Sequence, residues 1–596
     1  MRHLEKKSAL TTAAAGLTLA MALAACAGSP TQTPGQGQSA PAATGATAGG
    51  TEVADAAVGK IYNPSDKKGG TLKMANTADW DSLDPGNTYY GYSLNFARLY
   101  GRALLMFKAA PGTDGNTLVP DLAESVGKAS DDAKTWTYKL RKGVKFEDGT
   151  EVTSKDVAYA VARQFDKEIH PNGPTYLNAL LDWPKGYKGA YKSKDADFSS
   201  AVETPDDQTI IFHLKEPFGL FDYIMQMPMT MPVPKDKDTG TKYQEHVIST
   251  GPYKFEKNEI GKGFTLVRND QWDPATDPNR PALPDRIEVQ TGVNADDVDN
   301  RLISGDVHIA VDGLGIGNAA LPKVLPDPAL KARTDNPVQQ RTWYTSIIPD
   351  VAPLDNVECR RAIAFAADRN SLYRAYGGET GGVITTSLIP PSMAGYKPID
   401  LYKSEGDKGD VEKAKAALAK CGQPNGFETN IAYRTERTKE KAAAESLQQS
   451  LARVGIKLTL KPYPQDDYFA LYAGKPSYVK ENKIGLAING WGSDYPDTYG
   501  FMQAITDSRD IRDAGNYNLS VKIPEVDKMI DQIKAEPDAA KRADMWSQID
   551  HMVIDQAVVM PSVASKALYM RGKGLTNLFI SDSQQMYDYV GVGVQQ

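Results

Sequence analysis

A stretch near the carboxyl end of the chain gathers residue types that can hold a charged organic ligand. Residues 484–488 form an apolar run of strand length. Gly490 and Gly492 follow on either side of Trp491, and glycines leave the backbone amide groups accessible. Asp494 then adds a fixed negative charge. An aromatic ring, bare backbone and a carboxylate so close together suit an extended ligand that carries an amine.

The same residues also fit a purely structural role. A strand can run into an acidic turn with Trp491 in the hydrophobic core, because aromatic residues at strand ends usually bury against their neighbours. Asp497 lies in the same turn. It is the weaker binding candidate, and we expect it to cap the turn.

Composition and charge exclude some classes of function. The chain has 596 residues, of which 41% are hydrophobic and 24% charged, which is typical of a globular protein with room for several domains. The formal net charge is −7 and the pI is about 5.6. A nucleic-acid-binding protein would show a basic balance or a basic stripe. The sequence therefore predicts no nucleic-acid partner.

The amino-terminal residues are typical of a secreted lipoprotein. Basic residues precede an apolar run over residues 9–25, which indicates a signal peptide over residues 1–25. The run ends in Leu23, Ala24, Ala25 and Cys26, which resembles a bacterial lipobox, so we expect Cys26 to be lipidated after cleavage. The alternative is an ordinary signal peptide followed by a chance cysteine. The expected location is the extracytoplasmic face of a bacterial cell membrane.

The residues after Cys26 are predicted to form a tether. Residues 26–68 are rich in glycine, serine, threonine, proline, glutamine and alanine, and they have few large apolar side chains. Such a composition does not offset the entropy lost on ordering. We expect a disordered tether that holds a folded body away from the membrane surface.

Two further cysteines, Cys359 and Cys421, both lie in helical patterns. A disulfide between them is possible outside the cytoplasm. A pair of buried free thiols is the alternative. Neither spacing indicates a metal site, and no metal or other cofactor is predicted.

Motifs of catalysis are missing from the sequence. It contains no GxxxxGK[ST], no HExxH and no GxSxG. Any ATP hydrolysis would therefore belong to another subunit, and we predict a binding protein that is not an enzyme. A secreted hydrolase whose serine, histidine and acid meet only on folding remains a distant alternative.

Secondary structure can be predicted for several segments. Residues 93–107 follow a helical pattern, and Thr153 with Asp156 has the spacing of a capping box at the start of another helix. From about residue 340, strands and helices alternate, which predicts βα units in a second lobe. An apolar strand is expected at residues 558–563.

One segment resembles a known family. Residues 135–149 are similar to a signature of the extracytoplasmic solute-binding proteins of family 5, the dipeptide- and oligopeptide-binding lipoproteins of ATP-driven importers. Seven other segments, before and after this one, are also similar to the family and occur in the family's order: residues 69–72, 83–85, 121–124, 250–253, 268–272, 360–369 and 491–494. The resemblance covers essentially all of the chain after the predicted tether.

The resemblance implies an α/β fold with two lobes, like that of periplasmic binding proteins of type II, cluster C. The implied domains are lobe I (residues 69–110, 230–335 and 556–596), a subdomain inserted in lobe I (111–229) and lobe II (336–555). It also implies a monomer that captures a short peptide by hinge closure and delivers it to the permease and ATPase subunits of an ABC transporter.

The resemblance gives roles to individual residues. Asp494 occupies the position that accepts the α-ammonium of a peptide, and the backbone around Trp491 pairs with the peptide as an added strand. Arg437 matches a carboxylate-binding arginine, with a solvated loop charge paired with Glu436 as the alternative. Tyr89 and Tyr90 are expected to line the cleft from the other lobe.

Some aspects of the resemblance leave the ligand open. Tyr176 and Trp183 are weaker candidates, from a variable region. Residues 496–498 depart from the relatives' pattern, and relatives also carry oligosaccharides or chelated nickel. An oligosaccharide or a nickel chelate in the same fold is therefore the main alternative.

Overall fold

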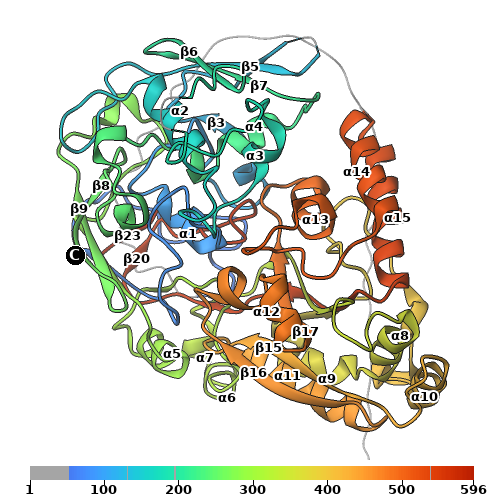
Figure 1. The fold of residues 1–596 in the computed structure, drawn as a ribbon. Coiled ribbons are helices and arrows are strands. Elements are labelled where there is room, and N and C mark those ends of the chain that lie inside the picture. The colour runs from blue at the N-terminus through green and yellow to red at the C-terminus, as the bar shows by residue number, and fades with distance from the viewer. Residues whose placement is uncertain (1–52, 131, 194–195, 537, 596) are drawn as a thin grey trace, which may run out of the picture. The chain divides into compact units, whose positions relative to one another are not determined.

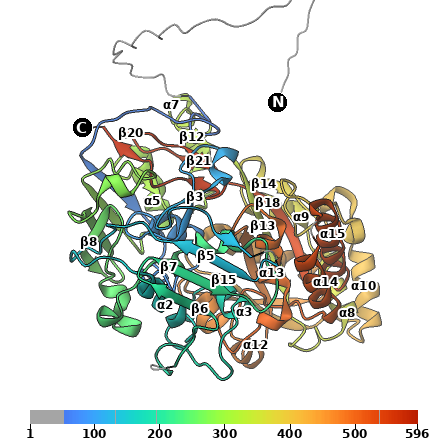
Figure 2. The ribbon, with the colours of Figure 1, turned by 90° about the horizontal axis from the view of Figure 1, so that it is seen from above.

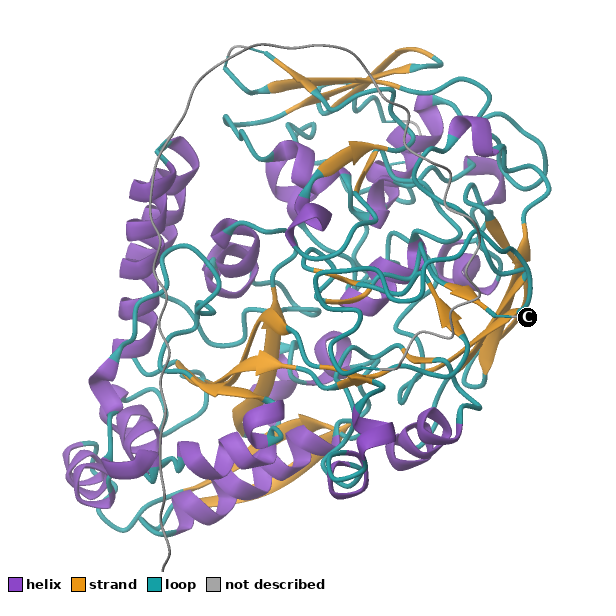
Figure 3. Ribbon diagram, turned by 180° about the vertical axis from the view of Figure 1, so that it is seen from behind, coloured by secondary structure: helices purple, strands orange, loops and turns teal. Residues whose placement is uncertain are grey.

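A computed structural model describes residues 53–130, 132–193, 196–536 and 538–595, which combine helices with several β-sheets (Figure 1, Figure 3). Among these residues, no helix combines the length and the apolar character that a membrane crossing requires. The predicted signal peptide and Cys26 lie outside the described residues.

A five-stranded sheet contains strands from the first half of the described chain. β1 pairs in parallel with β10 and β11, whereas β8, β9 and β10 pair antiparallel. The order across the sheet is β11 (Ile309–Ala310), β1 (Thr71–Ala75), β10 (Arg286–Gln290), β9 (Gly263–Arg268) and β8 (Tyr253–Glu259).

A six-stranded sheet forms the centre of the second half. Antiparallel pairing joins β13 to β17 and β18, and parallel pairing joins β15 to β16 and β17. The order across the sheet is β14 (Gly382–Ile384), β18 (Val559–Lys566), β13 (Val338–Ile347), β17 (Ile484–Gly492), β15 (Glu428–Arg434) and β16 (Lys457–Tyr463).

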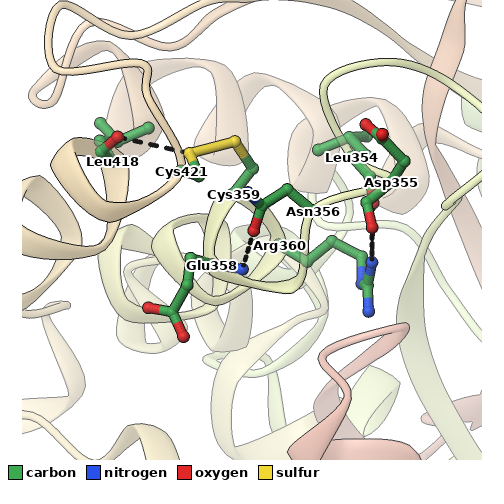
Figure 4. Close-up of a disulfide and its surroundings, with 8 residues drawn as sticks. All are labelled: Leu354, Asp355, Asn356, Glu358, Cys359, Arg360, Leu418 and Cys421. Atoms are coloured by element: carbon green, nitrogen blue, oxygen red, sulfur yellow. Dashed lines mark hydrogen bonds between the residues drawn. A yellow bond between two sulfur atoms is a disulfide. The ribbon is translucent and has the colours of Figure 1, made fainter.

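Helices pack against this sheet and share its hydrophobic core. They are α8 (Val357–Ala366), α9 (Arg369–Ala375), α10 (Val411–Lys420) and α11 (Thr438–Ala452). α8 and α10 contact each other, and a disulfide joins Cys359 to Cys421 between them, with 5.4 Å between the Cα atoms (Figure 4). The Asn356 side chain caps α8 by accepting a hydrogen bond from the Glu358 amide at 2.9 Å.

A four-stranded antiparallel sheet lies within residues 128–213. Its order is β4 (Lys128–Ala129), β5 (Thr135–Lys139), β7 (Thr209–His213) and β6 (Val202–Asp206). α2 (Ser154–Arg163) packs on β6 and β7 (Figure 2). The capping box predicted for Thr153 and Asp156 is confirmed, with 2.8 Å between the Thr153 amide nitrogen and the Asp156 carboxylate.

The remaining elements are a pair of longer helices, several shorter helices and four two-stranded sheets. α14 (Pro524–Ala535) and α15 (Ala539–Asp555) run alongside each other (Figure 1). Further helices are α1 (Gly91–Ala97), α3 (Tyr176–Leu180), α4 (Phe221–Met225), α5 (Ala295–Ser304), α6 (Leu321–Val324), α7 (Pro328–Lys331), α12 (Pro476–Glu481) and α13 (Thr498–Thr506). Two-stranded pairs are β2 (Leu105–Phe107) with β3 (Leu118–Pro120), β12 (Thr334–Asp335) with β19 (Tyr569–Met570), β20 (Leu575–Thr576) with β23 (Gly593–Val594), and β21 (Ile580–Ser581) with β22 (Met586–Tyr587).

The helix predicted over residues 93–107 is wrong beyond its first third. α1 ends at Ala97, and residues 105–107 form β2. Glycine is a poor helix former. At Gly101 a Cβ atom would lie 2.3 Å from the Met231 sulfur, so the chain turns where a neighbouring segment requires glycine.

The tether predicted over residues 26–68 extends too far. Within the described part, the Ala57 amide donates to the Asp335 carboxylate at 3.0 Å, and Tyr62 forms a β-bridge with Leu578. The Ser65 amide donates to Asn577 at 2.8 Å. Residues 53–68 therefore pack on the body, although their polar composition alone suggests a linker.

The last apolar strand joins a different sheet from the one expected. β18 contains most of the segment expected to return to lobe I, but it pairs with β13 and β14 in the six-stranded sheet. Seven of its eight residues are buried, and a strand buried on both faces has the same apolar pattern in either sheet. The other domain boundaries stay predictions.

Candidate functional site

One cavity is lined by all seven residues predicted to bind a ligand. Its empty volume is about 910 Å³, open solvent at the mouth included. The predicted residues in its wall are Tyr89, Tyr90, Arg437, Gly490, Trp491, Gly492 and Asp494. Residues that the sequence did not indicate include Arg98, Arg341, Arg434, Tyr517 and Gln585.

The backbone of β17 has an unpaired edge beside the cavity. β15 pairs with β17 as far as Ala487, whereas β13 pairs with β17 up to Gly492. In the described strands, residues 488–492 are therefore paired along one edge only. A peptide in extended conformation can add to such an edge by main-chain hydrogen bonds.

The two glycines of β17 make room for side chains of β13. Gly490 lies opposite Trp343, and a Cβ atom there would be 2.3 Å from the Trp343 ring. Gly492 lies opposite Arg341, and its Cβ atom would be 3.2 Å from an Arg341 Nη atom. The glycine spacing thus places an indole and a guanidinium over the strand.

Trp491 is mostly buried but lines the cavity. It is 8% exposed, and its ring packs edge-on against Tyr89 and at a tilt against Tyr517, with centroid distances of 5.8 and 5.3 Å. Its indole Nε1 is buried without a hydrogen-bond partner. Trp491 therefore belongs to the core and also offers a donor, so the two roles weighed from the sequence do not exclude each other.

Asp494 faces aromatic hydroxyls and no cation. One carboxylate oxygen accepts hydrogen bonds from the hydroxyls of Tyr89 and Tyr176, the latter at 2.7 Å. Burial raises the pKa of Asp494 to about 7, and the two tyrosine hydrogen bonds only partly oppose that effect. Among the described residues, none forms an ion pair with this carboxylate. It can accept a positively charged group.

Asp497 has a different role from Asp494. Its side chain caps α13 by accepting a hydrogen bond from the Tyr499 amide at 2.8 Å. Asp497 does not line the cavity. The expectation that it caps the turn is met.

Arg437 lies in the cavity wall, in the turn between β15 and α11. Its side chain is 3% exposed, and its Nε atom donates to the Gln465 side-chain oxygen at 2.6 Å. The guanidinium lies 5.5 Å from the centre of the Tyr90 ring, and the Tyr90 hydroxyl donates to the Gln465 carbonyl at 2.8 Å. Its ion pair is with Glu440 at 3.7 Å, so the alternative of a solvated charge paired with Glu436 does not fit.

Glu440 is bound more tightly by another arginine. The Nε atom of Arg434 lies 3.0 and 3.1 Å from the two Glu440 carboxylate oxygens. Arg341 adds a third guanidinium to this end of the cavity, and no described carboxylate lies within ion-pair distance of it. Burial, followed by the charge of Arg437, lowers the pKa of Arg341 to about 10.

The structure distinguishes the two weaker candidates, Tyr176 and Trp183. Tyr176 reaches Asp494, whereas Trp183 donates to the Leu177 carbonyl at 2.9 Å and stacks on Tyr187 within the hydrophobic core. Arg341 and Tyr517 were not predicted at all. The one available signal for Arg341 was its position two residues before Trp343, on the same face of a predicted strand.

The charged groups at the cavity do not form a metal site. Among the described residues, no group of three or more histidine, cysteine, aspartate or glutamate side chains could hold a metal ion. The cavity instead has a carboxylate on one part of its wall and arginines on another. This arrangement suits a ligand that carries both signs of charge.

Known proteins are similar to this chain in sequence or in fold. The protein titled "Clavulanic acid biosynthesis oligopeptide binding protein 2" has a solved structure that is 40% identical, with a TM-score of 0.81 over 91% of this chain and 98% of that one. The oligopeptide-binding protein OppA of Bacillus subtilis is 25% identical over 475 residues, or 77% of this chain and 82% of that protein. Heme-binding protein A of Haemophilus influenzae is 27% identical over 506 residues, or 81% of this chain and 85% of that protein.

The structural likeness confirms the predicted two-lobed α/β fold. Residues 117–513 match the family described as "Bacterial extracellular solute-binding proteins, family 5 Middle", which is more than half of the chain. The family resemblance predicted from the sequence is thereby confirmed. This chain belongs to the bacterial extracellular solute-binding proteins of family 5.

Proposed function

We propose that this chain is the lipid-anchored substrate-binding subunit of an ATP-driven importer and that its ligand is a short peptide with a free amino end. It acts as a monomer on the extracytoplasmic face of the cell membrane. It closes on the peptide and delivers it to a permease, whose ATPase subunits supply the energy. The protein itself catalyses no reaction.

One observation carries the choice of a peptide. The cavity has Asp494 without a cation on one part of its wall, and Arg341 and Arg437 without full neutralisation on another. A free peptide brings an ammonium group and a carboxylate, which are the charges that these residues lack. The relatives described above are named for oligopeptides and for heme, so their names do not agree on one ligand. The choice of a peptide therefore rests on the charges in the cavity wall.

The backbone supports the same ligand. The unpaired edge of β17 at residues 488–492 and the free Nε1 donor of Trp491 can bind a main chain without regard to its side chains. An oligosaccharide or a nickel chelate in the same fold remains the main alternative. That alternative would be favoured if Asp494 and Arg437 faced away from the cavity, and both line it.

Contacts between segments distant in the sequence support capture by closure. Tyr89 donates to Asp494, Tyr90 to the Gln465 carbonyl and Tyr517 to the Asn172 carbonyl, the last two at 2.8 and 2.7 Å. These hydrogen bonds hold the walls of the cavity together. A ligand that also bridges the walls binds this closed form better than an open one, which shifts the population toward it.

Binding of matched peptides tests the proposal. Asp494→Asn removes the charge but keeps an oxygen that can accept from Tyr89 and Tyr176. A charge-assisted hydrogen bond contributes roughly 1.5 to 3 kcal/mol, so free-amine peptides should bind about 10- to 150-fold more weakly. N-acetylated peptides should lose far less. Isothermal titration with the purified protein measures both series.

The matched control is Asp497→Asn, which keeps a helix-capping oxygen and lies outside the cavity. It should leave both affinities unchanged. Equal weakening of free and acetylated peptides by Asp494→Asn would refute the assignment of the ammonium. Mass spectrometry of the peptides after incubation separates binding from hydrolysis, because a hydrolase would consume what a binding protein retains.

The lipid anchor needs a separate test, since Cys26 lies outside the described residues. Cells that express the protein can be labelled with an alkyne analogue of palmitate. The wild-type chain should take up the label and fractionate with membranes, and Cys26→Ala should do neither. Labelling of the Cys26→Ala chain would overturn the anchor at this position.

A further inference from the structure

The Arg341 guanidinium has an unusual environment. The side chain lines the cavity, and its Nε atom is buried without a hydrogen-bond partner. Among the described residues, no hydrogen bond or ion pair involves this side chain, and its close neighbour is the Trp343 ring, 5.7 Å away. Leaving a partly buried guanidinium unpaired is costly unless something else supplies the negative charge.

The pairing of β13 with β17 places Arg341 beside the strand that is proposed to bind the ligand. β13 and β17 pair with Arg341 opposite Gly492, so the two residues point to the same side of the sheet. Because Gly492 has no side chain, the guanidinium can lie over it, with an Nη atom 3.2 Å from the place of the missing Cβ. A larger residue at 492 would displace the arginine.

The charges at this end of the cavity do not balance. Four guanidiniums line the cavity: that of Arg98 is paired with Asp588 at 3.1 Å, and the other three are those of Arg341, Arg434 and Arg437. The close carboxylate of these three is Glu440, which contacts Arg434 at 3.0 Å and Arg437 at 3.7 Å. The three positive charges therefore exceed the one negative charge by two.

Glu436 does not remove this excess. Its carboxylate accepts a hydrogen bond from the Gln465 amide at 2.9 Å, and it lines a neighbouring cavity instead of this one. Burial raises the pKa of Glu436. The charges that act on Arg341 include those of Arg437, Arg434 and Glu440, so its surroundings are net positive.

We propose that Arg341 binds a second anionic group and that the transported ligand carries one amine and two anionic groups. This inference rests on the function proposed above and narrows its ligand class. The amine occupies the Asp494 end, one carboxylate contacts Arg437, and the second lies at Arg341. Short peptides whose last residue is aspartate or glutamate have this pattern of charge.

Two pairs of peptides that differ by one charge test the inference. Ala-Glu is compared with Ala-Gln, and Ala-Ala-Glu with Ala-Ala-Gln, by isothermal titration at pH 7.5. In the wild-type protein, at least one acidic peptide should bind about tenfold or more tightly than its amide partner. Arg341→Gln should reduce that ratio to about one, because it removes the group that reads the second charge.

Two further variants keep the test specific. Arg437→Gln should weaken the acidic and the amide peptide by similar factors, since both carry the terminal carboxylate. Arg341→Met should behave like Arg341→Gln in binding. Neither Arg341 variant should lower the thermal midpoint of the unliganded protein, because no native hydrogen bond or ion pair is lost, and this result would show that the loss of preference is not a folding defect.

The outcomes separate this inference from the function on which it rests. Peptides that bind with equal affinity in each pair would overturn the second anionic site and leave the peptide function standing. A preference for acidic peptides that survives Arg341→Gln would overturn the role of Arg341. If none of the four peptides binds, both the proposed function and this inference fail.

Discussion

Two buried clusters of arginines show how charge balance separates structure from function. In one, Asp121 accepts hydrogen bonds from Arg102 at 2.8 Å and from Arg280 at 2.6 and 2.8 Å. Asp277 also contacts Arg280, at 3.0 Å. Two guanidiniums meet two carboxylates, and all four side chains are buried. Nothing in this cluster calls for an external ion.

The cavity cluster does not balance in this way. Arg434 and Arg437 share one carboxylate, that of Glu440, and no described carboxylate pairs with Arg341, while Asp494 faces two tyrosine hydroxyls and no cation. Both ends of the cavity therefore lack a partner. We infer that the balanced cluster needs no external ion, whereas the unbalanced one is completed by the proposed ligand, at a cost to the stability of the empty protein.

The largest expected effect concerns the balanced cluster. Asp121→Asn leaves two buried guanidiniums short of a partner, so the free energy of unfolding should fall by about 3 to 5 kcal/mol. Urea unfolding followed by circular dichroism measures this loss. The control is Asp207→Asn, whose ion pair with Lys155 is solvent-exposed and should contribute less than about 1 kcal/mol. Similar losses from both variants would break the comparison.

Substitution of Asp494 should change the free energy of unfolding in the opposite direction. Its pKa is raised from 3.8 to about 7 in the folded protein, so its contribution to stability is full below pH 4 and is lost as the pH rises through 7. Asp494→Asn should therefore raise the free energy of unfolding of the empty protein at pH 8, by on the order of 2 to 4 kcal/mol, and much less at pH 4. Urea unfolding at the two pH values checks this, and a loss of stability at pH 8 would contradict it.

Ligand affinity should depend on the same ionisation. An ammonium group binds the ionised carboxylate, so below pH 7 the protein must first release a proton from Asp494. The affinity for a free-amine peptide should fall by up to about tenfold per pH unit below that value. Titration between pH 5.5 and 8 measures the dependence, and Asp494→Asn should flatten it. If the wild-type protein and Asp494→Asn show the same pH dependence of affinity, another group is responsible for it.

The smallest expected effect is on the empty protein. Arg341→Gln removes a guanidinium that faces other guanidiniums and has no carboxylate of its own, so the free energy of unfolding should rise slightly, by about 0.5 to 1 kcal/mol. Arg434→Gln, which strips Glu440 of its bidentate partner, should lower it. Thermal unfolding without peptide compares the two. A loss from Arg341→Gln would mean that this arginine has a structural role.

The residues predicted from the sequence do line one cavity, and their roles toward a ligand stay predictions. Trp491 and Asp494 lie three residues apart in one stretch, and the family resemblance added Arg437 and Tyr89. Arg341 was missed because it becomes a cavity residue only through its register opposite Gly492. Strand register is a tertiary property, and a single sequence carries little sign of it.

The errors in the fold have similar causes. The helix expected over residues 93–107 ended early, and the Leu99 and Tyr100 carbonyls instead accept hydrogen bonds from the Tyr253 and Thr250 amides of a distant segment. The family resemblance implied that the segment of β18 returns to lobe I, whereas β18 pairs with β13 and β14, and its apolar pattern does not distinguish the two sheets. The capping box at Thr153 was predicted correctly, since all its atoms lie within one turn. Local signals were sufficient for local features only.

Proton release on binding tests the central claim most directly. We expect the purified protein to release between about half and one proton when a free-amine peptide binds at pH 6.5, because a carboxyl group with a pKa of about 7 becomes ionised. Titration calorimetry in buffers of different ionisation enthalpy measures this number. Asp494→Asn should abolish the release. Tight binding of the free-amine peptide to the wild-type protein with no proton released would contradict an ammonium group held by Asp494.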